Sequence, residues 1–102
     1  MESTSVRFAA AVRALGVEAR RHGLAVPGFR SPPRLTGVDR SLRRRVDGGA
    51  TIAVVLRGRP WPAVLADLVE GVVAANRLTG PAADQARSSL WSAVGGDTAA
   101  AA

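Results

Sequence analysis

The sequence contains no cysteine, no lysine and no tyrosine, and its single histidine is His22. Without cysteine, the chain has neither a disulfide framework nor a thiolate nucleophile. Any metal site would have to combine His22 with carboxylates, and we expect neither a metal nor a cofactor. No partner for His22 is evident, so we expect no nucleophile–base pair of the kind that covalent catalysis requires. These absences predict that the protein is not an enzyme.

Long apolar runs and phosphate-binding loops are also missing. Asp67 and Glu70 interrupt the longest apolar stretch, which therefore falls short of the ~18 residues of a membrane span. The glycines form no P-loop and no dinucleotide-binding motif. The first 20 residues carry Glu2 and Glu18 and have no clear cleavage site, so they indicate a helix and not a targeting peptide. We expect a cytoplasmic protein that does not contact membranes.

Length and composition are those of one small folded domain. The chain has 102 residues, of which 47% are hydrophobic and 22% are charged. We predict a single α+β domain over residues 1–94. The Ala-rich segment 95–102 lacks caps and is too short to persist as an isolated helix, so we predict a disordered tail there.

Positive charge dominates and is unevenly placed. All 14 basic residues are arginine, and the net charge is +6. Residues 30–59 alone contribute about +6, whereas residues 1–29 contribute about +2 and residues 60–102 about −2. The abundance of Ala, Arg, Gly and Val indicates GC-rich codon usage, which accounts for part of the arginine surplus. It does not account for the concentration of arginine in the middle third.

Helical periodicity is clear in three segments. Ser3, Thr4 or Ser5 can cap a first helix that ends at His22 and Gly23. Pro60, Trp61 and Pro62 begin a second helix, and residues 82–94 form a third. The expected buried positions of the first two helices are Phe8, Val12, Leu15, Ala19, Trp61, Val64, Leu65, Leu68, Val69, Val72 and Val73. Within the second helix, Gly71 suggests close approach of another backbone, and Asn76 suggests a local hydrogen bond.

The middle of the chain suggests a β-hairpin. Asp47, Gly48 and Gly49 have the composition of a tight turn between residues 40–46 and 50–58. We therefore predict a small antiparallel sheet, with a central hairpin at about 40–58 and an extra edge strand at about 24–30, covered on one face by three helices. The predicted core comprises Leu42, Ile52, Val54, Leu56, Leu65, Leu68 and Val72.

The arginines of this hairpin are the main candidate site. Strand alternation places several on its solvent face, where they can contact nucleic acid or another polyanion: Arg40, Arg43, Arg45, Arg57 and Arg59. Arg44 falls on the helix side, where Asp67 or Glu70 can pair with it. The alternative is that the charges protect a sheet edge from pairing with other chains.

Three further residues are secondary candidates for the same binding site. Arg30 and Arg34 flank a Pro-Pro segment that is either an anion-binding loop or, as we favour, a rigid connector. Trp61 follows two arginines and could stack on a base, although its position on an apolar helix stripe favours a core role.

Two classes of function fit these features. The first is a small non-catalytic basic binding module whose partner is nucleic acid or another polyanion. The second is a protein-interaction or regulatory accessory protein, in homo-oligomeric form or docked to an acidic protein partner. A contiguous arginine-lined concavity would favour the first class, and scattered arginines would favour the second.

Overall fold

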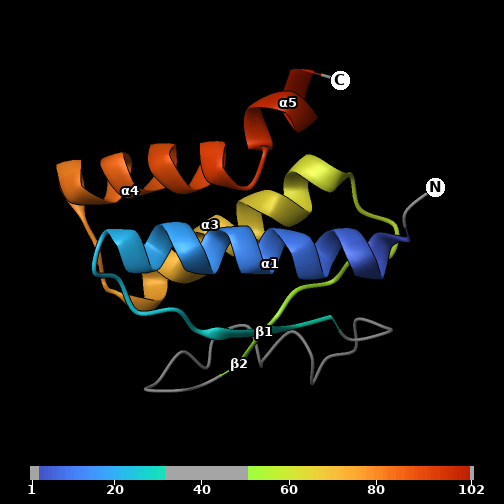
Figure 1. The fold of residues 1–102 in the computed structure, drawn as a ribbon, viewed down its shortest axis with the longest axis horizontal. Helices are drawn as coiled ribbons and strands as arrows, with labels where there is room; N and C mark the ends of the chain where they lie inside the picture. Colours follow the sequence, from blue (N-terminus) through green and yellow to red (C-terminus); the bar gives the residue numbers. More distant parts are fainter. Residues whose placement is uncertain (1–2, 32–50, 102) are drawn as a thin grey trace.

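The structure, a computed structural model, describes residues 3–31 and 51–101. Within these residues the chain forms helices and two short strands, whose arrangement is shown in Figure 1. In chain order the elements are α1 (Thr4–Arg21), β1 (Gly28–Arg30), β2 (Thr51–Ala53), α3 (Trp61–Ala75), α4 (Gly80–Ala93) and α5 (Gly96–Ala101).

The first helix begins and ends as the sequence predicts. Ser3 is the N-cap of α1, and its hydroxyl accepts a hydrogen bond from the Val6 amide at 3.2 Å. At the other end His22 is the C-cap, and Gly23 follows with a φ of +70°. This left-handed conformation costs glycine little, which explains why α1 stops here.

Helices α3 and α4 also follow their predicted periodicity. Pro60 is the N-cap of α3, and Pro62 lies in its first turn, where a missing amide hydrogen does no harm. The predicted stripe of α3 is buried from Val64 to Val73. Helix α4 starts at Gly80, two residues before the expected position, and buries Ala83 and Leu90.

The sheet differs from the prediction. β1 and β2 pair in parallel, with Phe29 beside Ile52, and they are the only paired strands among the described residues. The predicted antiparallel hairpin at 40–58 is therefore wrong for its second half, and residues 40–50 lie outside the described residues. An extra strand does form within the predicted 24–30 segment, but it is limited to Gly28–Arg30.

Burial of both sides of β2 explains the error. Strand alternation, which places Arg57 on the solvent face of the predicted hairpin, places Ala53 and Val55 on that face too, whereas they are only 2% and 8% exposed. Residues 52–56 form a continuous apolar run, which is typical of a parallel strand that is covered on both faces. The prediction gave more weight to the Gly-Gly turn signal than to this apolar run. The run lacks the alternation of apolar and polar residues that a strand with one solvent-facing side requires.

The helices lie on one side of the two strands. Figure 1 shows α1 between the sheet and α4, with α3 behind it, and α1, α3 and α4 pack against one another. Of the predicted core, Leu56 is partly buried and Leu42 lies outside the described residues. The other five predicted residues are buried in one cluster: Ile52, Val54, Leu65, Leu68 and Val72.

A short helix stands where a disordered tail was predicted. Helix α5 follows Gly95, whose φ of +78° changes the direction of the chain after α4 (Figure 1). Ala99 packs against the core cluster, and the Ser92 hydroxyl donates a hydrogen bond to Asp97 at 2.9 Å. Contacts with α3 and α4 thus hold a segment that would not be helical in isolation.

Asn76 and Gly71 connect α3 to distant segments. The Asn76 amide group donates to the Val72 carbonyl at 2.8 Å, which confirms the predicted local hydrogen bond. It also exchanges two hydrogen bonds with the backbone of Ala25, at 2.8 and 2.9 Å. At Gly71 the close neighbours are the side chains of Phe29 and Ile52, and not another backbone as predicted.

Candidate functional site

The structure separates the predicted site residues into two groups. Four of them lie outside the described residues: Arg34, Arg40, Arg43 and Arg45. Four are described: Arg30, Arg57, Arg59 and Trp61. Because β2 ends at Ala53, Arg57 lies in the connection to α3 and not on a hairpin strand as predicted.

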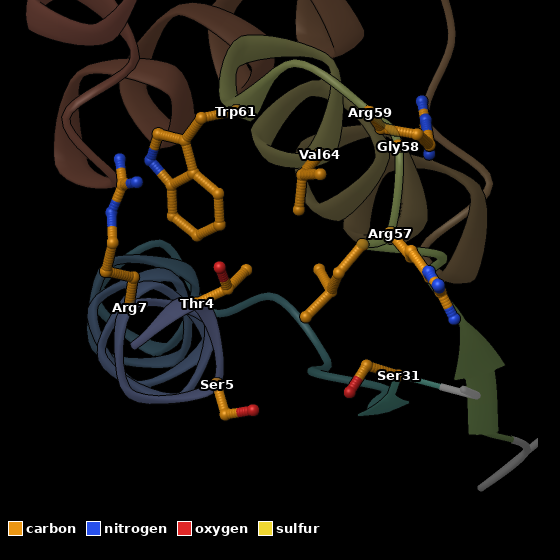
Figure 2. Close-up of a pocket in the computed structure, with 10 residues that line it drawn as sticks. Thr4, Ser5, Arg7, Ser31, Arg57, Gly58, Arg59, Trp61 and Val64 are labelled. Carbon is orange, nitrogen blue, oxygen red and sulfur yellow. The ribbon is translucent and has the colours of Figure 1, made fainter. Parts of the chain in front are cut away.

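Three of the four described residues line one pocket, which is shown in Figure 2. Its volume is about 670 Å³. It is formed by the N-terminal turn of α1, the residue after β1, the β2–α3 connection and the first turn of α3. The lining residues are Thr4, Ser5, Arg7, Ser31, Leu56, Arg57, Gly58, Arg59, Trp61 and Val64.

A tight turn shapes the wall formed by residues 56–59. The Arg59 amide donates a hydrogen bond to the Leu56 carbonyl at 3.3 Å, and Gly58 adopts a φ of +76°. A side chain at position 58 would strain this conformation. The turn therefore places Arg57 and Arg59 beside the start of α3, at the pocket wall opposite Arg7 in Figure 2.

The charged side chains in the described lining of this pocket are all positive. Three arginines line it, and none of its described lining residues is acidic. The first turns of α1 and α3 contain no acidic residue, so nothing there offsets the positive ends of the helix dipoles. The hydroxyls of Thr4, Ser5 and Ser31 add hydrogen-bonding groups. Such a lining is suited to an anionic ligand.

The three arginines differ in their availability. Arg59 forms an ion pair with Asp67 and donates to the Ala63 carbonyl at 3.4 Å, so much of its charge is neutralised within the fold. The predicted pairing of Arg44 with Asp67 or Glu70 stays a prediction, because Arg44 lies outside the described residues. Arg7 and Arg57 have no ion-pair partner among residues 3–31 and 51–101, and both are exposed.

Trp61 belongs both to the edge of the core and to the pocket lining. It packs partly buried against the core cluster, as favoured, but it also lines the pocket. The Arg7 guanidinium lies 4.3 Å from the centre of the indole ring, a cation–π contact. Sequence reasoning missed Arg7 as a site residue because 54 positions separate it from Trp61, and no local spacing joins them.

A second polar cluster joins α1 to α4. Contrary to the prediction, His22 has partners: its Nε2 atom lies 2.9 Å from Glu18 and 3.0 Å from the Ser89 hydroxyl. Ser89 also donates to Glu18 at 2.5 Å. The hydrogen bond from Ser89, and then that from His22, lowers the pKa of Glu18 below its ordinary value.

This cluster also contradicts the prediction that no pocket holds a nucleophile–base pair, because His22 and Ser89 line a cavity of about 200 Å³. Its geometry is not that of a catalytic triad. In a triad one imidazole nitrogen contacts the serine and the other contacts the acid. Here the Nε2 atom of His22 makes both contacts, and the serine hydroxyl donates a hydrogen bond directly to the carboxylate. We interpret the cluster as a structural link between α1 and α4.

The described residues provide neither a metal site nor a membrane-spanning helix. No group of three His, Cys, Asp or Glu side chains there is arranged to bind a metal ion. No helix within 3–31 or 51–101 has both the length and the apolarity needed to cross a membrane.

Similarity to other proteins adds nothing to this geometry. Comparisons of the chain with protein-family models, with curated proteins and with solved structures found no match.

Proposed function

We propose that this protein is a non-catalytic binding module that holds nucleic-acid phosphates at the pocket between α1 and the β2–α3 connection. The observation that carries the proposal is that Arg7 and Arg57, on opposite walls, both line one pocket whose described lining contains no carboxylate (Figure 2). Arginine presents a planar fork of donors that matches phosphate oxygens.

The distribution of paired and unpaired charge supports this location. Most of the described carboxylates are engaged by arginines other than Arg7 and Arg57: Glu18 by Arg21, Asp67 by Arg59, and both Glu70 and Asp84 by Arg87. No described carboxylate pairs with Arg7 or Arg57 at the pocket. With a net charge of +6, the whole chain would also attract a polyanion over a longer range.

A non-catalytic role agrees with the chemistry of the pocket lining. The described part of the lining offers hydroxyls, guanidinium groups and an indole, but no imidazole, carboxylate or thiol that could act as a base near neutral pH. The contact between Ser89 and His22 lies at a different cavity and lacks the triad arrangement.

The test is a titration of a labelled single-stranded oligonucleotide at several salt concentrations. Replacing Arg7 and Arg57 together by Gln should weaken binding at low salt. The slope of log affinity against log salt should fall by about 0.7 for each lost phosphate contact. The matched control replaces Arg13 and Arg20, which are exposed on α1 and do not line this pocket, so that the net charge changes equally.

The outcomes separate the pocket from a general charge effect. Equal losses in the two double variants would show that the pocket has no special role. An absence of binding by the wild type at low ionic strength would remove the nucleic-acid proposal. The part played by Arg40, Arg43 and Arg45, which lie outside the described residues, stays a prediction.

One observation favours the alternative of a protein-interaction module. Val6 and Val17 are each 54% exposed, and eleven residues separate them, so they lie on the same side of α1. If this side joins two copies of the chain, light scattering should give a dimer. Replacing both valines by Ser should then restore the monomer.

A further inference from the structure

We infer that the pocket binds one unpaired nucleotide of a strand, with the base against the apolar lining formed by Leu56, Trp61 and Val64 and the phosphates on either side of it at Arg7 and Arg57. This inference rests on the proposed function and deepens it. It names the unit that is recognised, a base together with the phosphates on either side of it, where the proposed function requires phosphate alone.

The size and lining of the pocket indicate more than a phosphate site. Its volume of about 670 Å³ lies well within the range of small-molecule sites, about 300–1,000 Å³, and greatly exceeds one phosphate group. Leu56, Trp61 and Val64 supply apolar surface to the lining, and the arginines and hydroxyls supply polar surface. Figure 2 shows the six-membered part of the Trp61 ring directed into the pocket, beside Val64. A ligand that fills this space has both an apolar part and an anionic part.

The Arg7–Trp61 contact favours a flat aromatic group as the apolar part. The guanidinium lies 4.3 Å from the indole centre, so a planar cation and an aromatic ring stand together at one side of the pocket. Guanidinium planes and aromatic rings are the two side-chain surfaces on which nucleic-acid bases stack. Arg7 can therefore contact a base and its phosphate from one position.

The shape of the site favours an unpaired base. Bases in a duplex are stacked inside the helix, and a protein pocket receives one only after it leaves the stack. In a single strand the bases are free to turn outward and enter. Ser31 and the hydroxyls of Thr4 and Ser5 lie in the same lining, where they can donate to or accept from base edges or the sugar.

The experiment compares four probes at one ionic strength. They are a single-stranded RNA octamer, the same octamer as a duplex, an abasic strand of equal length and charge, and adenosine monophosphate as a competitor. The single strand should bind roughly tenfold or more tightly than the abasic strand, which is the scale of one stacked base. It should also quench tryptophan emission, whereas the abasic strand should not.

Variants assign the difference to Trp61. Trp61→Leu, which keeps an apolar side chain, should lower the affinity for the single strand to that for the abasic strand and leave the abasic affinity unchanged. Circular dichroism checks that it folds. If the Trp61→Leu variant does not fold, the quenching of wild-type tryptophan emission decides whether the base contacts tryptophan. The matched control Trp91→Phe, on α4 and outside the pocket lining, should keep the preference.

Equal affinity for the single strand and the abasic strand would overturn this inference. Equal affinity for the single strand and the duplex would overturn it too. Either result would leave the proposed function intact. Failure of every probe to bind at low salt would overturn both. Competition by adenosine monophosphate would identify a free nucleotide as a sufficient ligand. If the single strand binds more tightly than the abasic strand but adenosine monophosphate does not compete, then the nucleotide must belong to a strand.

Discussion

Substitution of Gly71 by Ala should destabilise the protein, although an alanine in a helix is ordinarily more stable than a glycine by about 1 kcal/mol. A Cβ atom at position 71 would lie 2.8 Å from a ring carbon of Phe29 and 3.0 Å from the Cδ1 atom of Ile52. Such overpacking costs about 1–3 kcal/mol. The difference of the two effects predicts a net loss of up to about 2 kcal/mol, which urea unfolding followed by circular dichroism can measure.

Gly16 provides the matched control. It lies within α1, and the nearest atoms that a Cβ there would meet belong to the flexible guanidinium of Arg20, the first of them at 3.4 Å. Gly16→Ala should therefore stabilise the protein by up to about 1 kcal/mol. In a Phe29→Leu background, Gly71→Ala should cost less, because the ring that obstructs the new methyl group is absent. If Gly71→Ala stabilises the protein as Gly16→Ala does, then β1 and β2 do not pack on α3 as described here.

Three further predictions concern the core, a link between segments, and acid stability. Leu68→Ala should lower the free energy of unfolding by about 2–5 kcal/mol, since Leu68 is fully buried; a change below 1 kcal/mol would contradict its place in the core. Asn76→Ala should cost about 1–3 kcal/mol by removing three hydrogen bonds, and hydrogen exchange should become faster at the Ala25 amide; unchanged exchange would count against this link. Glu18 has a lowered pKa in the folded state, so its contribution to stability is present above the unfolded-state pKa of about 4.3 and is lost as the pH falls through the folded-state value. Glu18→Gln should reduce this acid dependence in urea titrations between pH 2 and 7; an unchanged pH profile would contradict the role of the cluster.

The helices were predictable because their signals are local. Ser3 caps α1 three residues before the amide that it binds, and proline marks the start of α3. Periodicity then identified the buried side of each helix, including Leu65, Leu68 and Val72. Each of these features depends on residues that are neighbours in one helix, so that no knowledge of distant contacts was needed.

The sheet was not predictable in the same way. Pairing of Phe29 with Ile52 joins residues that are 23 positions apart, whereas the Gly-Gly turn signal is local. The run from Ile52 to Leu56 did carry a relevant signal, because an apolar stretch without alternation is typical of a strand buried on both faces. Given more weight, it would have argued against a hairpin with one solvent-facing side.

The candidate site was only partly predictable. The sequence identified Arg57, Arg59 and Trp61, because they follow one another closely in the chain. It did not identify Arg7, whose place above Trp61 depends on how α1 packs against α3. It also could not show that Asp67 would neutralise Arg59, since that pairing depends on the turn at Gly58.

The binding claim is tested most directly by nuclear magnetic resonance of the ¹⁵N-labelled protein during titration with a single-stranded oligonucleotide. The chain has two tryptophans, and only Trp61 lines the pocket. We predict that the indole N–H signal of Trp61 and the amide signals of Ser5, Arg57 and Gly58 shift with the oligonucleotide concentration, while the indole signal of Trp91 stays in place. A titration that leaves the Trp61 signal unmoved, or that shifts the Trp91 signal equally, would contradict the assignment of this pocket as the binding site.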